Sequence, residues 1–391
     1  MNGSRLVFTP LSYTGWGSLS NLIPELEKHG AKNVLVITDP ALQEIGLVSK
    51  VTDPLEKKGF SIEIYSDIVP EPPLETGEKL VAFTREGDFD LVIGLGGGSA
   101  LDLAKLAAVL CVHEGSVESY LNLSETNQIQ FKGLPKILIP TTSGTGSEVT
   151  NISVLSLKTT KDVVAHDYLL ADAAIVDPEL TVSLPPRVTA ATGIDALTHA
   201  IESYVSIHAN PVTEGLSLHA IRLISRSIQD AVGNGDNKEA RIDMSYGSFL
   251  AGLAFFNAGV AGVHALAYPL GGQFHIPHGE SNAVLLPYVM AYIRESCSKK
   301  LANILHTMGS RPALASEEEA SILCAEKLKQ LAENTGIPVT LKGFHIQEEA
   351  LEVLTKDAIK QKRLLERSPM KLGEKEIQKI YQSAYNGTLS F

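Results

Sequence analysis

The sequence is poor in cysteine and in positive charge, and each shortage argues against a class of protein. Its 391 residues contain three cysteines, and Cys111, Cys297 and Cys324 lie far apart with no CxxC spacing. This argues against a disulfide scaffold and a cysteine-based zinc site, and it favours a reducing compartment. Lys and Arg number 33 against 45 Asp and Glu, giving a formal net charge of −12. We therefore expect no nucleic-acid partner and no anionic membrane surface, because these usually need a basic patch.

Targeting and membrane-spanning patterns are also missing. Residues 1–10 have no basic stretch followed by an apolar one, so we expect no secretory signal and a cytoplasmic protein. Residues 244–279 contain no Asp, Glu, Lys or Arg, but they include histidines, prolines, amides and many glycines. A transmembrane helix needs about 20 apolar residues in a row. We expect this run to form helices buried in a soluble protein.

The first half of the chain alternates short apolar runs with amphipathic segments. This alternation predicts a mostly parallel α/β sheet covered on both faces. The expected strands are residues 34–38, 62–65, 91–94, 137–139 and 174–176, and the expected helices are 19–29, 75–86 and 100–112.

The pattern changes at a proline-rich hinge, residues 183–187. Beyond it the sequence has long helical periodicities and no convincing strand. These periodicities cover residues 194–206, 214–232, 316–335 and 346–359. The sequence therefore predicts an α/β domain over residues 1–184 and an all-helical domain over residues 185–391.

A glycine-rich turn joins an expected strand to an expected helix in the segment LVIGLGGGSALDLAK, residues 91–105. Gly96, Gly97 and Gly98 would let the backbone approach a ligand, and the free N–H groups of the helix would suit a pyrophosphate. Ser99 is placed to cap the helix, with Asp102 three residues on as in a capping box. The usual GxGxxG fingerprint is absent, because Ser99 stands in place of its third glycine. A turn without any ligand is the alternative.

A second polar loop, PTTSGTGSEVT at residues 140–150, follows the strand expected at 137–139. Its hydroxyl side chains include those of Thr141, Thr142, Thr145 and Ser147. Open α/β sheets bind ligands at the carboxyl ends of their strands. Two such loops at strand ends predict a dinucleotide site. For the loop at residues 140–150, an ordinary polar turn is the alternative.

An acidic residue, Asp39, ends the strand expected at 34–38. A carboxylate there can accept hydrogen bonds from ribose hydroxyls and would repel a 2′-phosphate, which favours NAD over NADP. The equally good alternative is a helix cap before Pro40.

Residues of metal-binding type gather in the second half. Asp195 and His199 are four residues apart on the helix expected at 194–206, so they share one face, away from its apolar stripe. The uncharged run adds His264, His275 and His278. One aspartate with two or three imidazoles suits Fe²⁺, Zn²⁺, Co²⁺ or Mn²⁺, and these ligand types do not choose among them. The alternatives are a solvated i,i+4 pair and histidines with partners in the core.

Taken together, these segments resemble the iron-containing (group III) alcohol dehydrogenase family over essentially the whole chain. The resemblance implies a dinucleotide-binding α/β domain and a helical metal domain of dehydroquinate-synthase-like architecture, in a homodimer or larger homo-oligomer. The segments that carry it are GGGSALDLAK (96–105), PTTSGTGSE (140–148), AIVDP (174–178), GIDALTH (193–199), HALAYPLGG (264–272) and PHG (277–279).

The resemblance also implies roles for particular residues. Fe²⁺ is the ion it implies, with Zn²⁺ as the alternative. The implied metal ligands are Asp195, His199, His264 and His278. The implied NAD-binding residues are Asp39, Gly97, Gly98, Ser99, Thr141, Thr142 and Thr145, together with Lys161, whose spacing from Glu148 is shorter than in the family.

One departure from the family pattern concerns the proton route. Many members carry a histidine four residues after the third metal ligand, and this chain has Tyr268 there. His275 stands three residues before the last ligand, where many members have asparagine. Tyr268, His275, or the cofactor ribose with water are the candidates for proton transfer, and a phenol is a poorer acid than imidazole near neutral pH.

The resulting expectation is an NAD-linked, metal-dependent alcohol dehydrogenase or aldehyde reductase that acts on a small primary alcohol or diol. Its apolar walls are expected to include Phe255, Phe256 and Leu266, with Asn257 as a polar contact. The alternatives on the same scaffold are a hydroxyacid–oxoacid transhydrogenase, a glycerol-type dehydrogenase and a dehydroquinate-synthase-like lyase. A non-catalytic binding protein is disfavoured, because the four candidate ligands are intact.

Overall fold

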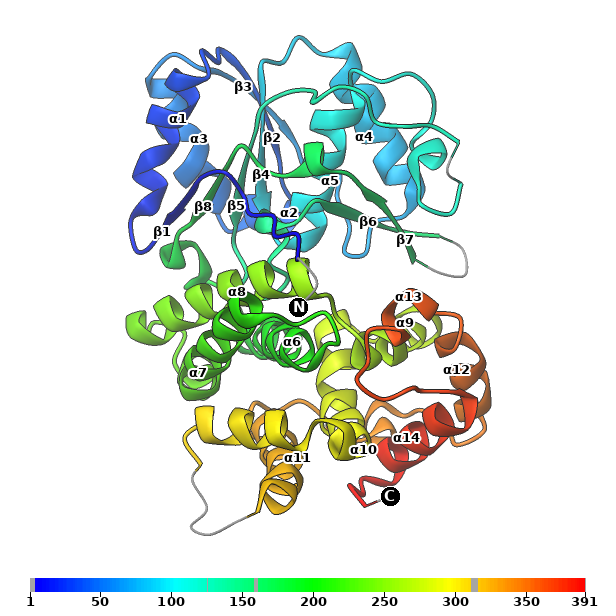
Figure 1. Ribbon diagram of the computed structural model, residues 1–391. Helices are drawn as coiled ribbons and strands as arrows, with labels where there is room; N and C mark the ends of the chain where they lie inside the picture. The colour runs from blue at the N-terminus through cyan, green and yellow to red at the C-terminus, as the bar shows by residue number, and fades with distance from the viewer. Residues whose placement is uncertain (1–3, 125, 158–160, 311–315, 391) are drawn as a thin grey trace. The chain divides into compact units, whose positions relative to one another are not determined.

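A six-stranded parallel sheet organises the first part of the computed structural model, which describes residues 4–124, 126–157, 161–310 and 316–390 (Figure 1). The strand order is β1-β8-β5-β4-β2-β3, and every pair is parallel. The strands are β1 (Ser12–Thr14), β2 (Asn33–Ile37), β3 (Ser61–Tyr65), β4 (Leu91–Gly96), β5 (Lys136–Pro140) and β8 (Ala173–Val176).

Helices cover both faces of this sheet, as the near-continuous apolar strands predicted (Figure 1). On β2, Val34 and Val36 pack into one core with α1 and α3, while Leu35 and Ile37 pack into the other with α4 and α5. This alternation follows from the two-residue period of a strand. The helices are α1 (Leu22–Lys28), α2 (Pro40–Glu44), α3 (Leu47–Lys57), α4 (Leu74–Glu86) and α5 (Gly98–Leu110).

The expected strands and helices of this region are present within a few residues, but three strands were not predicted. One is β1, which is only three residues long. The other two form an antiparallel hairpin, β6 (Ile152–Ser156) and β7 (Lys161–Ala165). Short 3₁₀ turns complete the region: η1 (Ser18–Asn21), η2 (Val117–Tyr120), η3 (Ser147–Val149), η4 (Asp167–Leu169) and η5 (Pro178–Thr181).

The chain separates into two units, residues 8–182 and residues 183–390, and residues 4–7 group with the second. The second unit is helical, and its described residues contain no strand, so the predicted fold class is confirmed. Its helices are α6 (Pro186–Val205), α7 (Pro211–Gly233), α8 (Lys238–Ala258), α9 (Gly262–Phe274), α10 (His278–Thr307), α11 (Glu317–Asn334), α12 (Ala350–Ala358), α13 (Lys362–Leu365) and α14 (Glu374–Asn386), with the 3₁₀ turn η6 (Leu341–Phe344).

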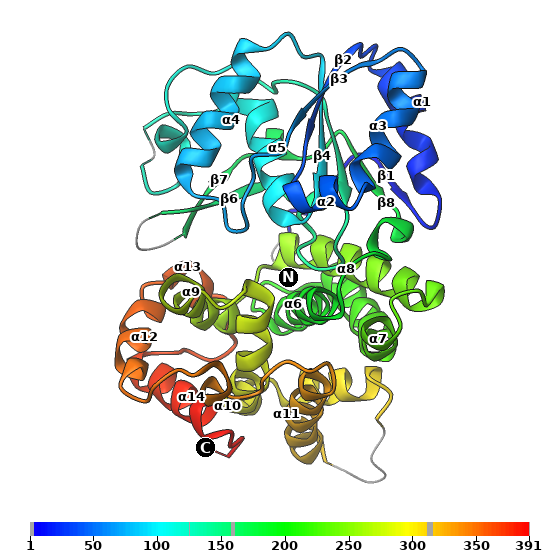
Figure 2. The same cartoon turned by 180° about the vertical axis from the view of Figure 1, so that it is seen from behind.

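The helix α6 forms the centre of this unit. It begins at Pro186, eight residues before the expected start, because proline suits the first position of a helix. It packs against α7, α8 and α10, and α12 and α13 lie beside α9 (Figure 2). Both the apolar stripe of α6 and the face that carries Asp195 and His199 are buried. This burial sets the environment of the candidate metal ligands.

The uncharged run of residues 244–279 forms most of α8, all of α9 and the start of α10. Among the described residues, no single helix has the length and apolarity of a membrane span. The pair α8 and α9 reaches that length and composition only together, and it is bent by 105°. Most of the apolar side chains of α9 are buried in the helical core.

Candidate active site

The glycine turn predicted to bind phosphate lies where β4 ends and α5 begins. Gly96 has φ 153°, and a Cβ there would lie 2.8 Å from the Cβ of Ala100. A Cβ on Gly98 would lie 2.7 Å from Thr145 Cγ2 in the second polar loop. At Gly97 the nearest atoms to such a Cβ belong to Thr142, at 3.5 Å and beyond. The missing side chains therefore let the two predicted loops lie directly against each other.

The predicted capping box on α5 is wrong. Gly97 is the N-cap residue and has no side chain to form a cap, and no side chain of the described residues accepts a hydrogen bond from the first turn. The Ser99 hydroxyl instead accepts a hydrogen bond from the N–H of Glu71 at 3.2 Å. The first N–H groups of α5 are thus left for another acceptor, as a phosphate site requires.

Asp102 points into the interior, where it joins a buried polar network. Its Oδ1 accepts from the Ser147 hydroxyl at 2.5 Å and lies 2.8 Å from Lys105 Nζ. Lys105 is fully buried and also donates to the Ser147 carbonyl, the Ser147 hydroxyl and the Thr150 hydroxyl. The network ties α5 to the second loop and holds the loop in place. Sequence spacing did not indicate this role for Lys105, because its partners Ser147 and Thr150 are more than 40 residues away in the chain.

Beside this network, Glu148 supplies a pH-dependent contribution to stability. Burial raises the pKa of Glu148 from 4.5 to about 7, although its own N–H and Lys105 act in the opposite direction. The unfolded carboxyl loses its proton near pH 4.5, while the folded one keeps it until about pH 7. The folded state therefore binds more protons in this window, and the free energy of unfolding falls as pH rises through it.

We expect Glu148→Gln to remove this pH dependence. At 1.36 kcal/mol per pKa unit, the contribution lost by the natural protein between pH 4.5 and 7 is about 3 kcal/mol. Urea unfolding followed by circular dichroism at pH 5 and pH 7.5 measures it. An unchanged difference between the two pH values in the variant would contradict the assignment.

Asp39 forms the helix cap that was one of its two predicted roles, and its ribose contact stays a prediction. It caps α2 by accepting from the N–H of Leu42 at 3.1 Å. Its other oxygen faces the glycine turn, 3.4 Å from where a Cβ of Gly96 would lie. The carboxylate is therefore at the carboxyl end of β2, beside the turn.

Two further predicted cofactor residues lie near the same turn. The N–H of Thr141 donates to the carbonyl of Gly96 at 3.0 Å. Lys161, at the start of β7, forms an ion pair with Glu71 at 2.8 Å. Since Glu71 also bonds to Ser99, Lys161 is linked to the glycine turn through one residue.

The four predicted metal ligands come together within the helical unit. Asp195 and His199 lie on α6, His264 on α9, and His278 is the first residue of α10. One donor atom from each lies within 4.8 Å of the others. Asp195 Oδ1 is 3.9 Å from the Nε2 atoms of His199 and His264 and 3.6 Å from that of His278.

These donors are mostly shielded from solvent. Asp195, His199 and His264 are at most 5% exposed, and the side chain of His278 is 30% exposed. Burial raises the pKa of Asp195, but the three histidines and the Asn282 amide outweigh it and hold that pKa below its ordinary value. The carboxylate is therefore ionised and available as a ligand.

Two residues that the sequence analysis missed contact these donors. Glu202, one turn after His199 on α6, is fully buried and bonds to His264 Nδ1 at 2.5 Å. Asn282, one turn after His278 on α10, donates to Asp195 Oδ1 at 2.7 Å. Both follow a ligand by three or four residues on the same helix. That spacing was the available signal.

The predicted walls are only partly placed as expected. The Phe255 ring stacks on His199 at 4.3 Å between centroids. Leu266 is fully buried in the helical core. Asn257 exchanges two hydrogen bonds with the backbone of Val7, so its amide anchors the N-terminal segment. Its expected role as a polar contact for the substrate stays a prediction, and the structure shows that its amide already bonds to the backbone.

The candidate proton-transfer residues differ in environment. The Tyr268 ring lies 6.0 Å from the His278 ring, and burial raises the pKa of the Tyr268 hydroxyl, with Arg363 opposing. His275 ends α9 in the left-handed conformation, with φ 55°, and is exposed. A phenol with a raised pKa keeps its proton and is a poor base near neutral pH.

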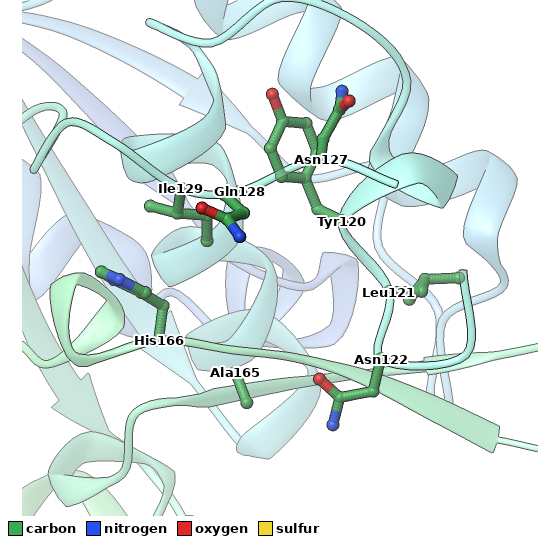
Figure 3. Close-up of a pocket in the computed structure, with 8 residues that line it drawn as sticks. All are labelled: Tyr120, Leu121, Asn122, Asn127, Gln128, Ile129, Ala165 and His166. Carbon is green, nitrogen blue, oxygen red and sulfur yellow. The ribbon is translucent and has the colours of Figure 1, made fainter. Parts of the chain in front are cut away.

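A separate cavity of about 370 Å³ lies in the α/β unit (Figure 3). It is lined by the segments 120–122 and 127–129 and by Ala165 and His166. None of the predicted site residues lines it. The titratable side chains that line the cavity are those of His166 and Tyr120. The His166 ring accepts a hydrogen bond from the N–H of Tyr168 at 3.1 Å.

The chain matches two family models that together cover most of its length. Residues 10–178 match the iron-containing alcohol dehydrogenase model, and residues 189–385 match that of the Fe-containing alcohol dehydrogenase family, C-terminal. The fold and site thus define an oxidoreductase of the alcohol dehydrogenase class. The chain belongs to the iron-containing alcohol dehydrogenase family.

Similar proteins agree with this assignment. The Long-chain-alcohol dehydrogenase 1 of Geobacillus thermodenitrificans (strain NG80-2) is 68% identical over all of this chain and 98% of its own length. The crystal structure of a 1,3-propanediol oxidoreductase is 34% identical, with a TM-score of 0.93 over 98% of this chain and all of that one. The sulfoacetaldehyde reductase of Bifidobacterium kashiwanohense, solved with NAD⁺, is 28% identical, with a TM-score of 0.88 over 98% and 99%.

Proposed function

We propose that this protein oxidises primary aliphatic alcohols with NAD at a divalent metal centre formed by Asp195, His199, His264 and His278. The observation that carries the proposal is the convergence of these four donor atoms from three helices within 4.8 Å. Cofactor binding is assigned to residues 1–184, and metal and alcohol binding to residues 185–391.

The chemistry of the donor set supports a divalent transition metal. One carboxylate and three imidazoles form a mixed oxygen and nitrogen site that suits Fe²⁺ and also Zn²⁺. Asp195 and Glu202 are two buried carboxylates, and no described lysine or arginine forms an ion pair with either. A divalent cation would balance their two negative charges, which are costly to bury alone. We propose Fe²⁺, in keeping with the family.

The role of the ion would be that of a Lewis acid, which polarises the alcohol oxygen and lowers the pKa of its hydroxyl. The protein holds the carboxylate and imidazoles in place and keeps water away, since three of the four ligands are nearly inaccessible. The ring of Phe255, stacked on His199, gives the centre an apolar side. Such a wall suits an alkyl chain rather than a charged substrate.

The NAD site is assigned to the glycine turn and the second polar loop. The free N–H groups of α5 would bind the diphosphate, next to Gly97, Gly98 and Ser99. The close packing of Gly98 on Thr145 supports a cradle made by both loops. Thr141 and Thr142 complete the second loop. Asp39 would accept hydrogen bonds from the ribose, and Lys161 would act near the turn through Glu71.

For the proton we propose His275 as the acceptor and Tyr268 as a hydrogen-bond donor near the ligand His278. An imidazole changes charge near neutral pH, whereas the buried Tyr268 phenol keeps its proton. His275→Gln should then change the pH dependence of kcat. Tyr268→Phe should change the value of kcat and leave its pH dependence as it is.

The alkyl-chain length of the substrate is proposed from similarity. The relative at 68% identity carries a long-chain-alcohol name, so we propose that long primary alcohols are accepted as well as the small ones expected from the sequence. A cytoplasmic location is proposed from three buried cysteines that form no disulfide. A homo-oligomer is proposed by analogy with the family, and light scattering would measure it.

A direct assay tests this function. Protein stripped with chelator would be reloaded with Fe²⁺ under anaerobic conditions or with Zn²⁺, and NADH formation measured with primary alcohols from ethanol to hexadecan-1-ol. We expect net NADH with Fe²⁺ and a preference for NAD over NADP. Oxidation of an alcohol only when an oxo acid is present, with no net NADH, would establish a transhydrogenase instead.

A further inference from the structure

His264 is held from opposite sides by two residues that are not among the four donors. On one side, Glu202 Oε2 lies 2.5 Å from His264 Nδ1. On the other, Asn282 Nδ2 lies 3.1 Å from His264 Nε2. All three side chains are nearly inaccessible to solvent. No water can replace either contact easily, so both contacts constrain the ring.

The chemistry of these partners decides which ring nitrogen carries the hydrogen. A carboxylate accepts only, so the hydrogen of the Glu202 contact belongs to Nδ1. Asn282 Nδ2 is also 2.7 Å from Asp195 Oδ1, a carboxylate oxygen, which requires an N–H at that end of the amide. The same amide nitrogen lies 3.1 Å from His264 Nε2 and 3.3 Å from His278 Nε2, so the two ring nitrogens share its second hydrogen. His264 Nε2 can accept from it only through a lone pair. The Glu202 contact requires hydrogen on Nδ1, and the Asn282 contact is compatible with the same tautomer.

We propose that Glu202, assisted by Asn282, fixes His264 as the Nδ1–H tautomer, with the Nε2 lone pair directed at the other donors. Glu202 is therefore a positioning residue that sets the metal affinity of the centre. This inference rests on the proposed function, because it takes the four donor residues as metal ligands. An imidazole with hydrogen on Nε2 has no lone pair there and cannot bind a metal through that atom.

A second contact explains why Glu202 cannot simply turn away. Its Oε1 accepts from the N–H of Val263 at 2.6 Å, in the first turn of α9. That N–H has no partner within its own helix. Glu202 thus uses Oε1 to hold the N–H of Val263 at the start of α9. It uses Oε2 to orient the ring of the next residue, His264. Both oxygens are needed as acceptors.

Glu202→Gln tests this most sharply, because it keeps the shape but leaves one acceptor for two donors. Either Val263 loses its acceptor or the Gln amide donates to His264 Nδ1 and moves the hydrogen to Nε2. We expect the affinity for Fe²⁺ or Co²⁺, measured by competition with a chelator, to fall about 10- to 100-fold. Glu202→Asp keeps two acceptors and should bind metal more tightly than Glu202→Gln. Glu352→Gln, at an exposed i,i+4 pair, is the matched control.

A second readout separates positioning from a general loss of structure. In metal-free protein labelled with ¹⁵N-histidine, the His264 resonance, assigned by its loss in His264→Ala, should show Nδ1–H in the natural protein. In Glu202→Gln it should shift toward Nε2–H or a mixture. Equal metal affinity in the two proteins, or an Nε2–H tautomer in the natural one, would overturn the inference. A natural protein that binds no transition metal would overturn the proposed function instead.

Discussion

Replacing His264 with alanine should abolish metal binding and reduce kcat/KM for alcohol oxidation by about a thousandfold or more. His264 supplies one of four donor atoms from a position that is 2% exposed, so water replaces it poorly. A metal acting as a Lewis acid contributes several kcal/mol to such a reaction, and about 1.4 kcal/mol corresponds to a factor of ten. Metal content after dialysis and the rate of NADH formation measure the effect.

A control separates chemistry from folding in this test. His208→Ala changes an exposed histidine outside the centre and should leave both quantities unchanged. Because His264→Ala leaves Glu202 Oε2 buried without its imidazole partner, the melting temperatures of both metal-free proteins should be compared. A folded His264→Ala protein with full metal content and activity would show that the four donors are not the centre.

Replacing Gly98 with valine should weaken NAD binding by about a hundredfold while leaving metal content intact. A Cβ at this position would lie 2.7 Å from Thr145 Cγ2, closer than real Cβ atoms come, and 3.0 Å from the Thr145 hydroxyl, which is also a tight contact. The two loops must then separate, and the N–H groups of α5 move with them. Since a diphosphate depends on several such N–H groups at once, a displacement of this kind weakens all of its bonds.

The change in NAD affinity can be read from quenching of Trp16 fluorescence or from NADH fluorescence during titration. Gly215→Val is the matched control, because an added Cβ on this α7 glycine meets nothing within 4 Å. An unchanged dissociation constant for NADH in Gly98→Val would place the diphosphate elsewhere. Loss of metal together with NADH affinity would indicate unfolding rather than a local effect.

The parts of the fold that depend on local periodicity could be predicted from the sequence. Strand β2 is apolar from Val34 to Ile37 because both of its faces are covered, and α4 buries one face at Gly77, Leu80, Val81 and Thr84. The strand β1 has only three residues, which is too short for a period to emerge. The hairpin of β6 and β7 has half-buried, mixed sequences that resemble a loop. Its stability comes from pairing with a partner, which a local pattern does not contain.

The candidate site shows the same limit. Asp195, His199, His264 and His278 could be chosen because their residue types are rare in apolar segments and sit in recognisable motifs. Ser99 was assigned to a cap because the spacing to Asp102 fits one. In the structure Asp102 bonds to Lys105, one turn further along α5, and to Ser147, which comes close only after folding. Glu202 was missed for the same reason, because its partner His264 lies on a different helix.

The most direct test of the account is a titration of metal-free protein with Fe²⁺ under anaerobic conditions, measuring bound iron and NADH formation in the same samples. If the four donors form the catalytic centre, activity with a primary alcohol should rise in proportion to bound iron and stop rising at one ion per chain. Glu202→Gln should reach the same end point at higher free Fe²⁺. Full activity in metal-free protein, or activity that does not follow bound iron, would contradict the account.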